Sequence, residues 1–157
     1  MQSRSARGRR FAAIVLATVG AALTFSAGTA HAGPQHHGTN PSNVGPGATG
    51  CNLNASLIGT RPLLLGGQGD EVGVLEIYYS YSCQTNWLRV RDNTLGGRAE
   101  KRISSDGMPG IPPEVDYGYG ASHSMQAYAP GSTCVNYDVW ISDPTEYYVG
   151  YAGGRLC

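Results

Sequence analysis

Histidine is the first residue type to consider, because nucleophilic catalysis needs a base beside the nucleophile. His123 lies in the string Gly120-Ala-Ser-His-Ser124, which lacks the final glycine of the G-x-S-x-G motif. The surrounding residues alternate as they do in a strand rather than at a strand-to-helix turn. His123 is therefore interpreted first as a part-buried structural residue, with a catalytic base as the alternative. The sequence predicts no catalytic residue.

Two pairs of carboxylates are the next candidates for chemistry. Asp70 and Glu71 follow a glycine-rich turn, and Glu114 and Asp116 follow two prolines. A glycosidase needs its two carboxyl groups about 5–10 Å apart across a cleft, and spacing within loops does not establish such a distance. Both pairs are interpreted as solvated loop charges.

His36 and His37 are the only other histidines after residue 32, and they could bind a metal weakly. They lie within residues 33–50, a stretch with five glycines and three prolines that is predicted to be a flexible leader. No P-loop, dinucleotide fingerprint or calcium loop occurs in the sequence. We therefore expect no metal site and no cofactor.

The chain has an even number of cysteines, and no two of them have the C-x-x-C spacing. The four are Cys51, Cys83, Cys134 and Cys157. That pattern is typical of two structural disulfides rather than of a zinc or redox site. Three pairings are compatible with the sequence. We favour Cys51–Cys83 with Cys134–Cys157, because each bridge joins neighbours in the chain and the second restrains the C-terminus.

Residues 1–32 have the three-part layout of a secretory signal peptide. Arginines precede the uninterrupted apolar run from Phe11 to Phe25, and Ala30-His-Ala32 supplies small residues for cleavage. Fifteen helical residues span only about 22 Å, which is too short for a membrane of about 30 Å. The expected product is a secreted, extracellular protein without stable membrane insertion. Sec and twin-arginine export both remain open.

The formal net charge of zero conceals an uneven distribution. Removal of residues 1–32 leaves 125 residues that carry 7 basic and 11 acidic side chains. A mildly acidic chain is not a basic nucleic-acid binder, so no nucleic-acid partner is expected. The remaining length suits one domain, which we place at residues 51–157.

The spacing of short alternating runs and glycine-rich turns predicts an all-β domain. Residues 72–83 alternate most clearly, and the short link after Cys83 predicts an antiparallel hairpin with residues 87–92. In that hairpin Glu76 could pair with Arg89 or Arg91. Further strands are expected at residues 55–65, 98–104, 121–129, 135–142 and 147–151. Five to seven strands favour a small antiparallel sandwich or barrel.

The stretch from Leu75 to Val90 reads L-E-I-Y-Y-S-Y-S-C-Q-T-N-W-L-R-V, and Thr49-Gly-Cys51 precedes it. It resembles the E-L-x-Y-S-x-x-C-x-T-x-W-x-R-V signature of domain-of-unknown-function family 2690, secreted proteins of Gram-positive bacteria. The family often has arginine at the position of Tyr78 and proline at that of Tyr81. The resemblance implies a small exported bacterial β domain. It carries no established activity and therefore assigns no catalytic residue.

Tyrosine is the compositional feature that stands out. Ten tyrosines and two tryptophans follow residue 32, without any phenylalanine. Both residue types combine an apolar ring with a hydrogen-bonding group and suit recognition surfaces, although tyrosine is also common in β-sheets for packing alone. We expect a ligand-binding surface formed by Tyr78, Trp87, Arg89 and Trp140.

Three functions remain open from the sequence. The first is a non-catalytic domain that binds cell-envelope or extracellular ligands, such as a cell-wall glycan or a secreted protein, through its Tyr/Trp surface. The second is an inhibitor of secreted proteases or other hydrolases that presents the proline-rich loop Asp106-Gly-Met-Pro-Gly-Ile-Pro-Pro113. The third is a small secreted hydrolase based on His123 or a carboxylate pair.

Overall fold

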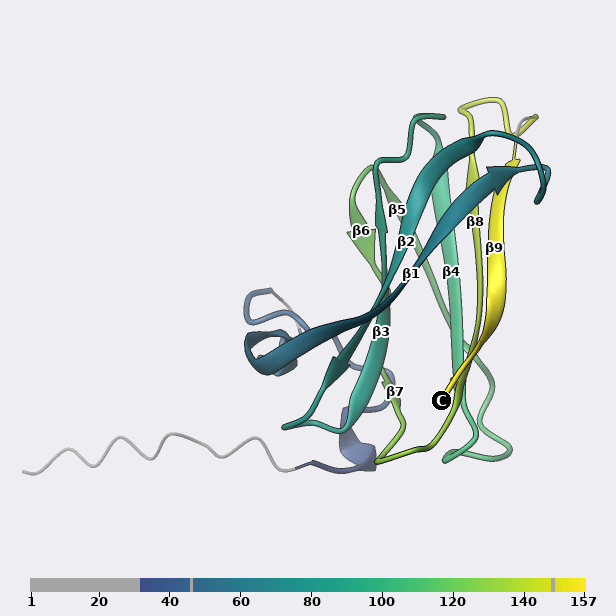
Figure 1. The fold of residues 1–157 in the computed structure, drawn as a ribbon. Coiled ribbons are helices and arrows are strands. Elements are labelled where there is room, and N and C mark those ends of the chain that lie inside the picture. Colours follow the sequence, from purple (N-terminus) through teal and green to yellow (C-terminus); the bar gives the residue numbers. More distant parts are fainter. Residues whose placement is uncertain (1–31, 46, 148) are drawn as a thin grey trace, which may run out of the picture.

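The computed structural model describes residues 32–45, 47–147 and 149–157 and is built of β-strands with two short 3₁₀ turns (Figure 1). The two turns, η1 and η2, lie at Pro34–His36 and Cys51–Asn54. The strands are β1 (Ala55–Leu65), β2 (Glu71–Ser80), β3 (Thr85–Arg91), β4 (Arg98–Ser105), β5 (Glu114–Tyr119), β6 (Ser122–His123), β7 (Ala127–Tyr128), β8 (Val135–Ser142) and β9 (Val149–Leu156).

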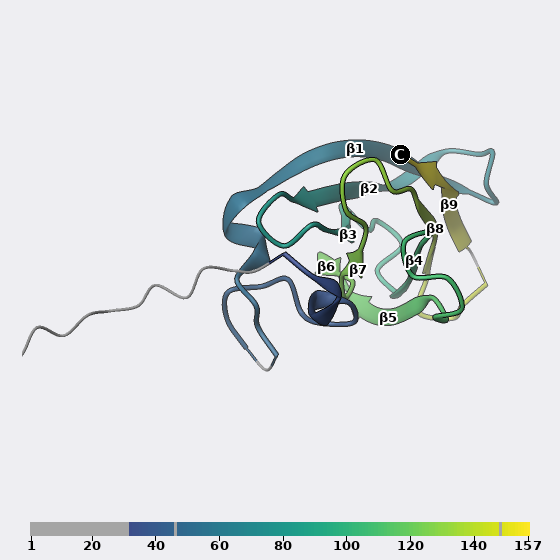
Figure 2. The ribbon, with the colours of Figure 1, turned by 90° about the horizontal axis from the view of Figure 1, so that it is seen from below.

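These strands form one antiparallel sheet in the order β5-β4-β8-β9-β1-β2-β3-β6, with β7 also paired to β3. The sheet curls around its core into a nearly closed barrel, as the view from below shows (Figure 2). The prediction of a small antiparallel all-β domain is confirmed. Seven strands have six or more residues, and the two additional ones have two residues each.

The β2–β3 hairpin has the predicted antiparallel pairing, and Glu76 lies directly opposite Arg89. β1 and β8 have the predicted bounds. The predicted strand over residues 121–129 is instead divided into β6 and β7. Between them, Gln126 exchanges backbone hydrogen bonds with Gly38 and Thr39, so this segment pairs with the leader.

One strand was missed and another was predicted with the wrong bounds. Glu114 and Asp116, interpreted as loop charges, belong to β5, whose less exposed positions are Glu114, Asp116 and Gly118 and so form no apolar face to detect. β9 extends through Gly153 and Gly154 to Leu156. Crowding rather than a turn favours glycine here, since a Cβ on Gly153 would lie 2.6 Å from Asp138 Oδ1.

The core fills the barrel interior and is made of residues that alternate along each long strand. Its side chains come mainly from β2, β3, β4 and β8, so both halves of the sheet contribute to one core. The fully buried members are Leu63, Leu75, Ile77, Leu88, Val90, Ala99, Ile103, Ala127, Ala129, Val139 and Ile141.

Both favoured disulfides, Cys51–Cys83 and Cys134–Cys157, are present. The first joins η2 to the β2–β3 turn, and the second joins the start of β8 to the residue after β9. Two disulfides fit a protein of an oxidising compartment.

The described part of residues 33–50 differs from the flexible leader that we expected, because Thr39 and Thr49 hydrogen-bond to the domain. Gln126 explains their position, since its side chain is fully buried and donates hydrogen bonds from Nε2 to Thr39 Oγ1 at 2.7 Å and Thr49 Oγ1 at 3.0 Å. Its Oε1 accepts a hydrogen bond from Thr85 Oγ1 at 2.6 Å. A polar group buried in this way must be satisfied internally, and the leader provides the partners.

The predicted signal peptide lies outside the described residues, apart from Ala32. Among the residues that the structure describes, no helix has the length and apolar character needed to cross a membrane.

Candidate functional site

A pocket of about 300 Å³ opens on the outer face of the β2–β3 hairpin. One side of the pocket is the hairpin together with β6, and the other side is the leader together with η2. The residues that line it are Pro41, Ser42, Asn52, Ala55, Tyr78, Trp87, Arg89 and His123. Three of the four predicted ligand-binding residues therefore share one concave surface.

Strand register explains why these side chains meet. Tyr78 and Trp87 are direct partners in the β2–β3 ladder, and their rings stack with centroids 5.7 Å apart and planes 8° apart. Arg89 and His123 are direct partners between β3 and β6. Side chains of directly paired residues project from the same face of a sheet, so both pairs open toward the leader.

Trp87 is much less exposed than expected. Its residue exposure is only 4%, although it projects from the outer face of the barrel. Tyr78 stacks on the indole, and Pro41 of the leader, which is itself buried, lines the same pocket. Trp87 thus forms a wall of the pocket rather than an open aromatic platform.

Glu76 lies beside the pocket and is the best-connected charge of the hairpin. Its side chain is 9% exposed and lies 3.1 Å from Arg91 Nε and 3.6 Å from Arg89 Nη1. It also accepts a hydrogen bond from the Tyr78 hydroxyl at 3.1 Å. The predicted cross-strand pairing of Glu76 is confirmed, with both arginines as partners. Glu76 thus holds the Tyr78 hydroxyl and the Arg91 guanidinium closely, and the Arg89 guanidinium lies farther from it.

Trp140 does not join this surface. It lies on β8, where its ring contacts Tyr151 at 5.4 Å between centroids and the Arg102 guanidinium at 5.0 Å. It lines a different hollow, together with residues such as Arg98 and Glu146. β8 and β3 are separated by three strands in the sheet, so the four predicted residues do not form one patch.

His123 Nε2 hydrogen-bonds to Asn40 Oδ1 at 3.1 Å, which links β6 to the leader. The adjacent Ser124 is fully buried and donates its hydroxyl proton to the Met125 carbonyl. Ser124 Oγ also accepts the amide proton of Leu88. These bonds give Ser124 a structural role, so a nucleophile activated by His123 finds no support in this pairing.

The pKa of His123 is lowered, first by burial and then by the positive charge of Lys101. Arg89 lowers this pKa further, whereas the negative charge of Asp116 acts in the opposite direction. Since an unperturbed histidine has a pKa of about 6.5, His123 is mainly neutral at pH 7. Its ring nitrogens then offer the pocket hydrogen bonding rather than a full positive charge.

Next to the pocket, side chains rather than a strand ladder close the barrel. Lys101 of β4 is fully buried and donates a hydrogen bond from Nζ to Ser122 Oγ at 3.0 Å. Asp116 of β5 accepts the Met125 amide proton at 2.7 Å. Gly118 permits this approach, because a Cβ there would lie 2.5 Å from Ser122 Cβ. Sequence reasoning missed Lys101, although its position between the inward-facing Ala99 and Ile103 indicates that it points inward.

Replacing Lys101 with methionine is expected to remove the pH dependence that Lys101 gives to the free energy of unfolding. Burial lowers the pKa of Lys101 more than Asp116 raises it, so the folded state disfavours the charge. The wild-type free energy of unfolding should then rise with pH from the lowered pKa toward about 10.4, the unfolded value. Denaturant unfolding between pH 7 and pH 10 measures this rise, which should be smaller in the variant.

The matched control for this variant is Arg61→Met on β1, where the side chain is exposed. This change is expected to alter the free energy of unfolding by no more than about 0.5 kcal/mol. An equal rise with pH in Lys101→Met and in the wild type would mean that the folded state does not disfavour the Lys101 charge.

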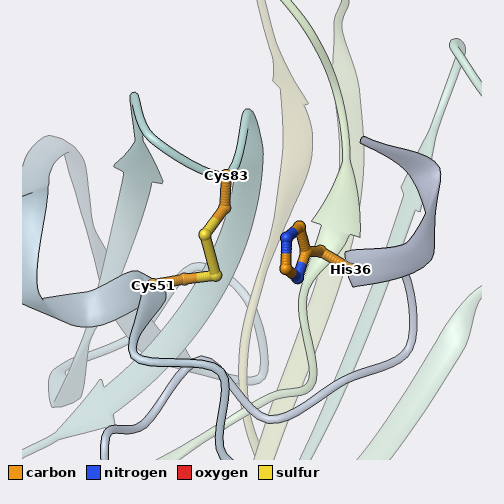
Figure 3. A group of neighbouring side chains, drawn as sticks. All are labelled: His36, Cys51 and Cys83. Atoms are coloured by element: carbon orange, nitrogen blue, oxygen red, sulfur yellow. A yellow bond between two sulfur atoms is a disulfide. The ribbon is translucent and has the colours of Figure 1, made fainter. Parts of the chain in front are cut away.

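His36 lies beside the Cys51–Cys83 disulfide, and the ring faces the two sulfur atoms (Figure 3). The ligand-type atoms of these three residues lie within 4.8 Å of one another. Both sulfurs are committed to the disulfide bond, so neither is available as the thiolate that a metal ion binds. This grouping therefore packs the leader against the disulfide.

The remaining predicted features lie apart from the pocket. His37 Nε2 lies 3.3 Å from Glu114 Oε1, and its Nδ1 accepts the Tyr128 amide proton at 3.3 Å, which attaches the leader to β5 and β7. Asp70 and Glu71 are exposed at the β1–β2 turn, as expected for solvated charges. The loop over residues 106–113 is largely exposed, and Asp106 anchors it through its contacts with Arg155 and Asn136.

Comparisons of the chain with protein-family models, with curated proteins and with solved structures found no match.

Proposed function

We propose that this chain is a secreted, non-catalytic binding domain that takes a cell-wall glycan in the pocket between its β2–β3 hairpin and its leader. The observation that carries the proposal is the pocket that Tyr78, Trp87 and Arg89 line together. The family resemblance of residues 75–90 supports an exported role, and two disulfides are compatible with it.

The pocket has the mixed character that suits a sugar. Its volume of about 300 Å³ is at the lower end of the range for small-ligand sites. The Tyr78 and Trp87 rings supply apolar area, while the Asn52 amide and the Arg89 guanidinium supply polar groups. Aromatic residues that combine an apolar ring with a polar group are typical of recognition sites.

Filling the pocket is the direct test of this proposal. Asn52 lines the pocket from η2 and is exposed, so Asn52→Trp is expected to block the pocket without disturbing the core. Retention of the protein on purified Gram-positive cell-wall material should fall about tenfold or more, equivalent to about 1.4 kcal/mol of binding free energy. A sedimentation assay with increasing amounts of wall material measures this change.

Asn54→Trp is the matched control, because Asn54 is exposed in the same turn but does not line the pocket. Trp140→Ala tests the separate hollow on β8 in the same assay. Both controls should be retained as the wild type is. The proposal fails if wild-type protein is not retained, or if both tryptophan substitutions in η2 have the same effect.

A further inference from the structure

The charge of the pocket lining narrows the class of ligand, on the basis of the proposed function. Arg89 and His123 line the pocket, and no aspartate or glutamate among the residues that the structure describes does so. The two side chains project side by side because the residues are direct partners across β3 and β6. The pocket therefore presents positive charge from Arg89 and a group that can gain positive charge at His123.

Glu76 leaves most of the Arg89 guanidinium available. The single polar contact described for Arg89 is the 3.6 Å approach of Nη1 to Glu76, which is longer than a hydrogen bond. Arg91 has the closer contacts, at 3.1 Å to Glu76 and 3.4 Å to Asp92. A guanidinium carries five N–H donors in a planar fork, so Arg89 retains donors for a ligand.

We infer that the pocket selects a sugar that carries one carboxylate, and that Arg89 binds this carboxylate. Arginine binds carboxylates through two parallel hydrogen bonds, which orient the ligand as well as attract it. One guanidinium matches the single charge of a carboxylate better than the charge of about −1.5 to −2 on a phosphate monoester. The sugar ring can then contact Tyr78, with its hydroxyl groups toward Ser42 and Asn52.

Binding of such an anion should strengthen as the pH falls. Three charged groups face His123: Lys101 from β4 and Arg89 from β3 oppose its protonation, and Asp116 from β5 favours it. From the leader, the uncharged Asn40 amide accepts its hydrogen bond. A bound carboxylate would add a further negative charge and promote protonation of His123. By linkage, protonation of His123 then increases affinity for the carboxylate.

The experiment uses three probes, glucuronic acid, glucose and glucose 6-phosphate, titrated against the protein by NMR chemical shifts at pH 7.5. Glucuronic acid should bind about tenfold more tightly than glucose, the order expected for a hydrogen bond to a charged group at a half-exposed site. Arg89→Gln should remove this preference. Arg102→Gln is the matched control, since Arg102 has similar exposure and pairs with a glutamate, Glu100, but does not line the pocket.

The pH arm repeats the titrations at pH 5.5. Affinity for glucuronic acid should increase at the lower pH, affinity for glucose should not change, and His123→Gln should abolish the increase. Equal binding of glucuronic acid and glucose, or a preference unaffected by Arg89→Gln, overturns the carboxylate assignment. Tighter binding of glucose 6-phosphate overturns it in favour of a phosphorylated ligand.

These outcomes differ from failure of the proposed function. If the wild type is retained on cell-wall material and Asn52→Trp blocks retention, the pocket is a binding site whatever charge it prefers. If the wild type is not retained on cell-wall material, the glycan proposal itself is overturned. A preference for glucuronic acid that depends on Arg89 would still support the anion assignment.

Discussion

Gln126→Ala is expected to lower the free energy of unfolding by about 3 kcal/mol and to detach the leader from the domain. The Gln126 side chain is fully buried and connects Thr39 and Thr49 of the leader with Thr85 of β3. Truncation leaves these hydroxyl groups without their partner and creates a cavity beside the Cys51–Cys83 disulfide. Denaturant unfolding measures the loss of stability.

Limited proteolysis measures detachment of the leader. The peptide bonds next to Thr39 and Thr49 should be cleaved faster in Gln126→Ala than in the wild type, because both residues lose their side-chain bond to Gln126. Gln68→Ala is the matched control, because Gln68 is exposed in the turn before β2. The contrary outcome is that Gln126→Ala unfolds at the same midpoint denaturant concentration as the wild type and keeps its leader protected. In that case the backbone bonds of Gly38 and Thr39 alone hold the leader, and the role assigned to the Gln126 side chain is wrong.

Removal of the Cys51–Cys83 disulfide by the double change to serine is expected to lower stability by about 3–4 kcal/mol. The bridge joins two cysteines that are 32 positions apart in the sequence, and both are fully buried. It joins η2, which carries one wall of the pocket, to the hairpin, which carries the other. The variant should therefore also lose retention on cell-wall material while the barrel still folds.

The matched comparison is the double change to serine at Cys134 and Cys157, which are less buried. These cysteines are 23 positions apart in the sequence. Because the entropy of loop closure changes only slowly with loop length, the expected loss of stability is similar. Because this bridge does not line the pocket, that variant should keep its binding wherever it remains folded. Thermal unfolding monitored together with the sedimentation assay separates the two effects. Equal loss of binding in both folded variants would contradict the assigned role of the first bridge.

Local periodicity was sufficient to predict the hairpin. β2 and β3 alternate in sequence and are joined by a short turn, which limited the partner of Glu76 to Arg89 or Arg91. The structure gives the exact register, with Arg89 opposite Glu76 and Trp87 opposite Tyr78. The all-β class and the favoured cysteine pairing were likewise predicted from the sequence. These features depend on neighbours in the chain, and the sequence contains that information directly.

Contacts between distant segments were decided only by the tertiary structure. Glycine-rich composition indicated a flexible leader, but the buried Gln126 amide requires partners that the leader supplies across 77 or more residues of sequence. The same packing covers Trp87 and builds the second wall of the pocket. The residues around Trp140 alternate between apolar and polar as clearly as those around Trp87 do. The strand order nevertheless places the two tryptophans in separate parts of the sheet. The sequence thus determined which side chains face outward, and long-range packing determined which of them line one site.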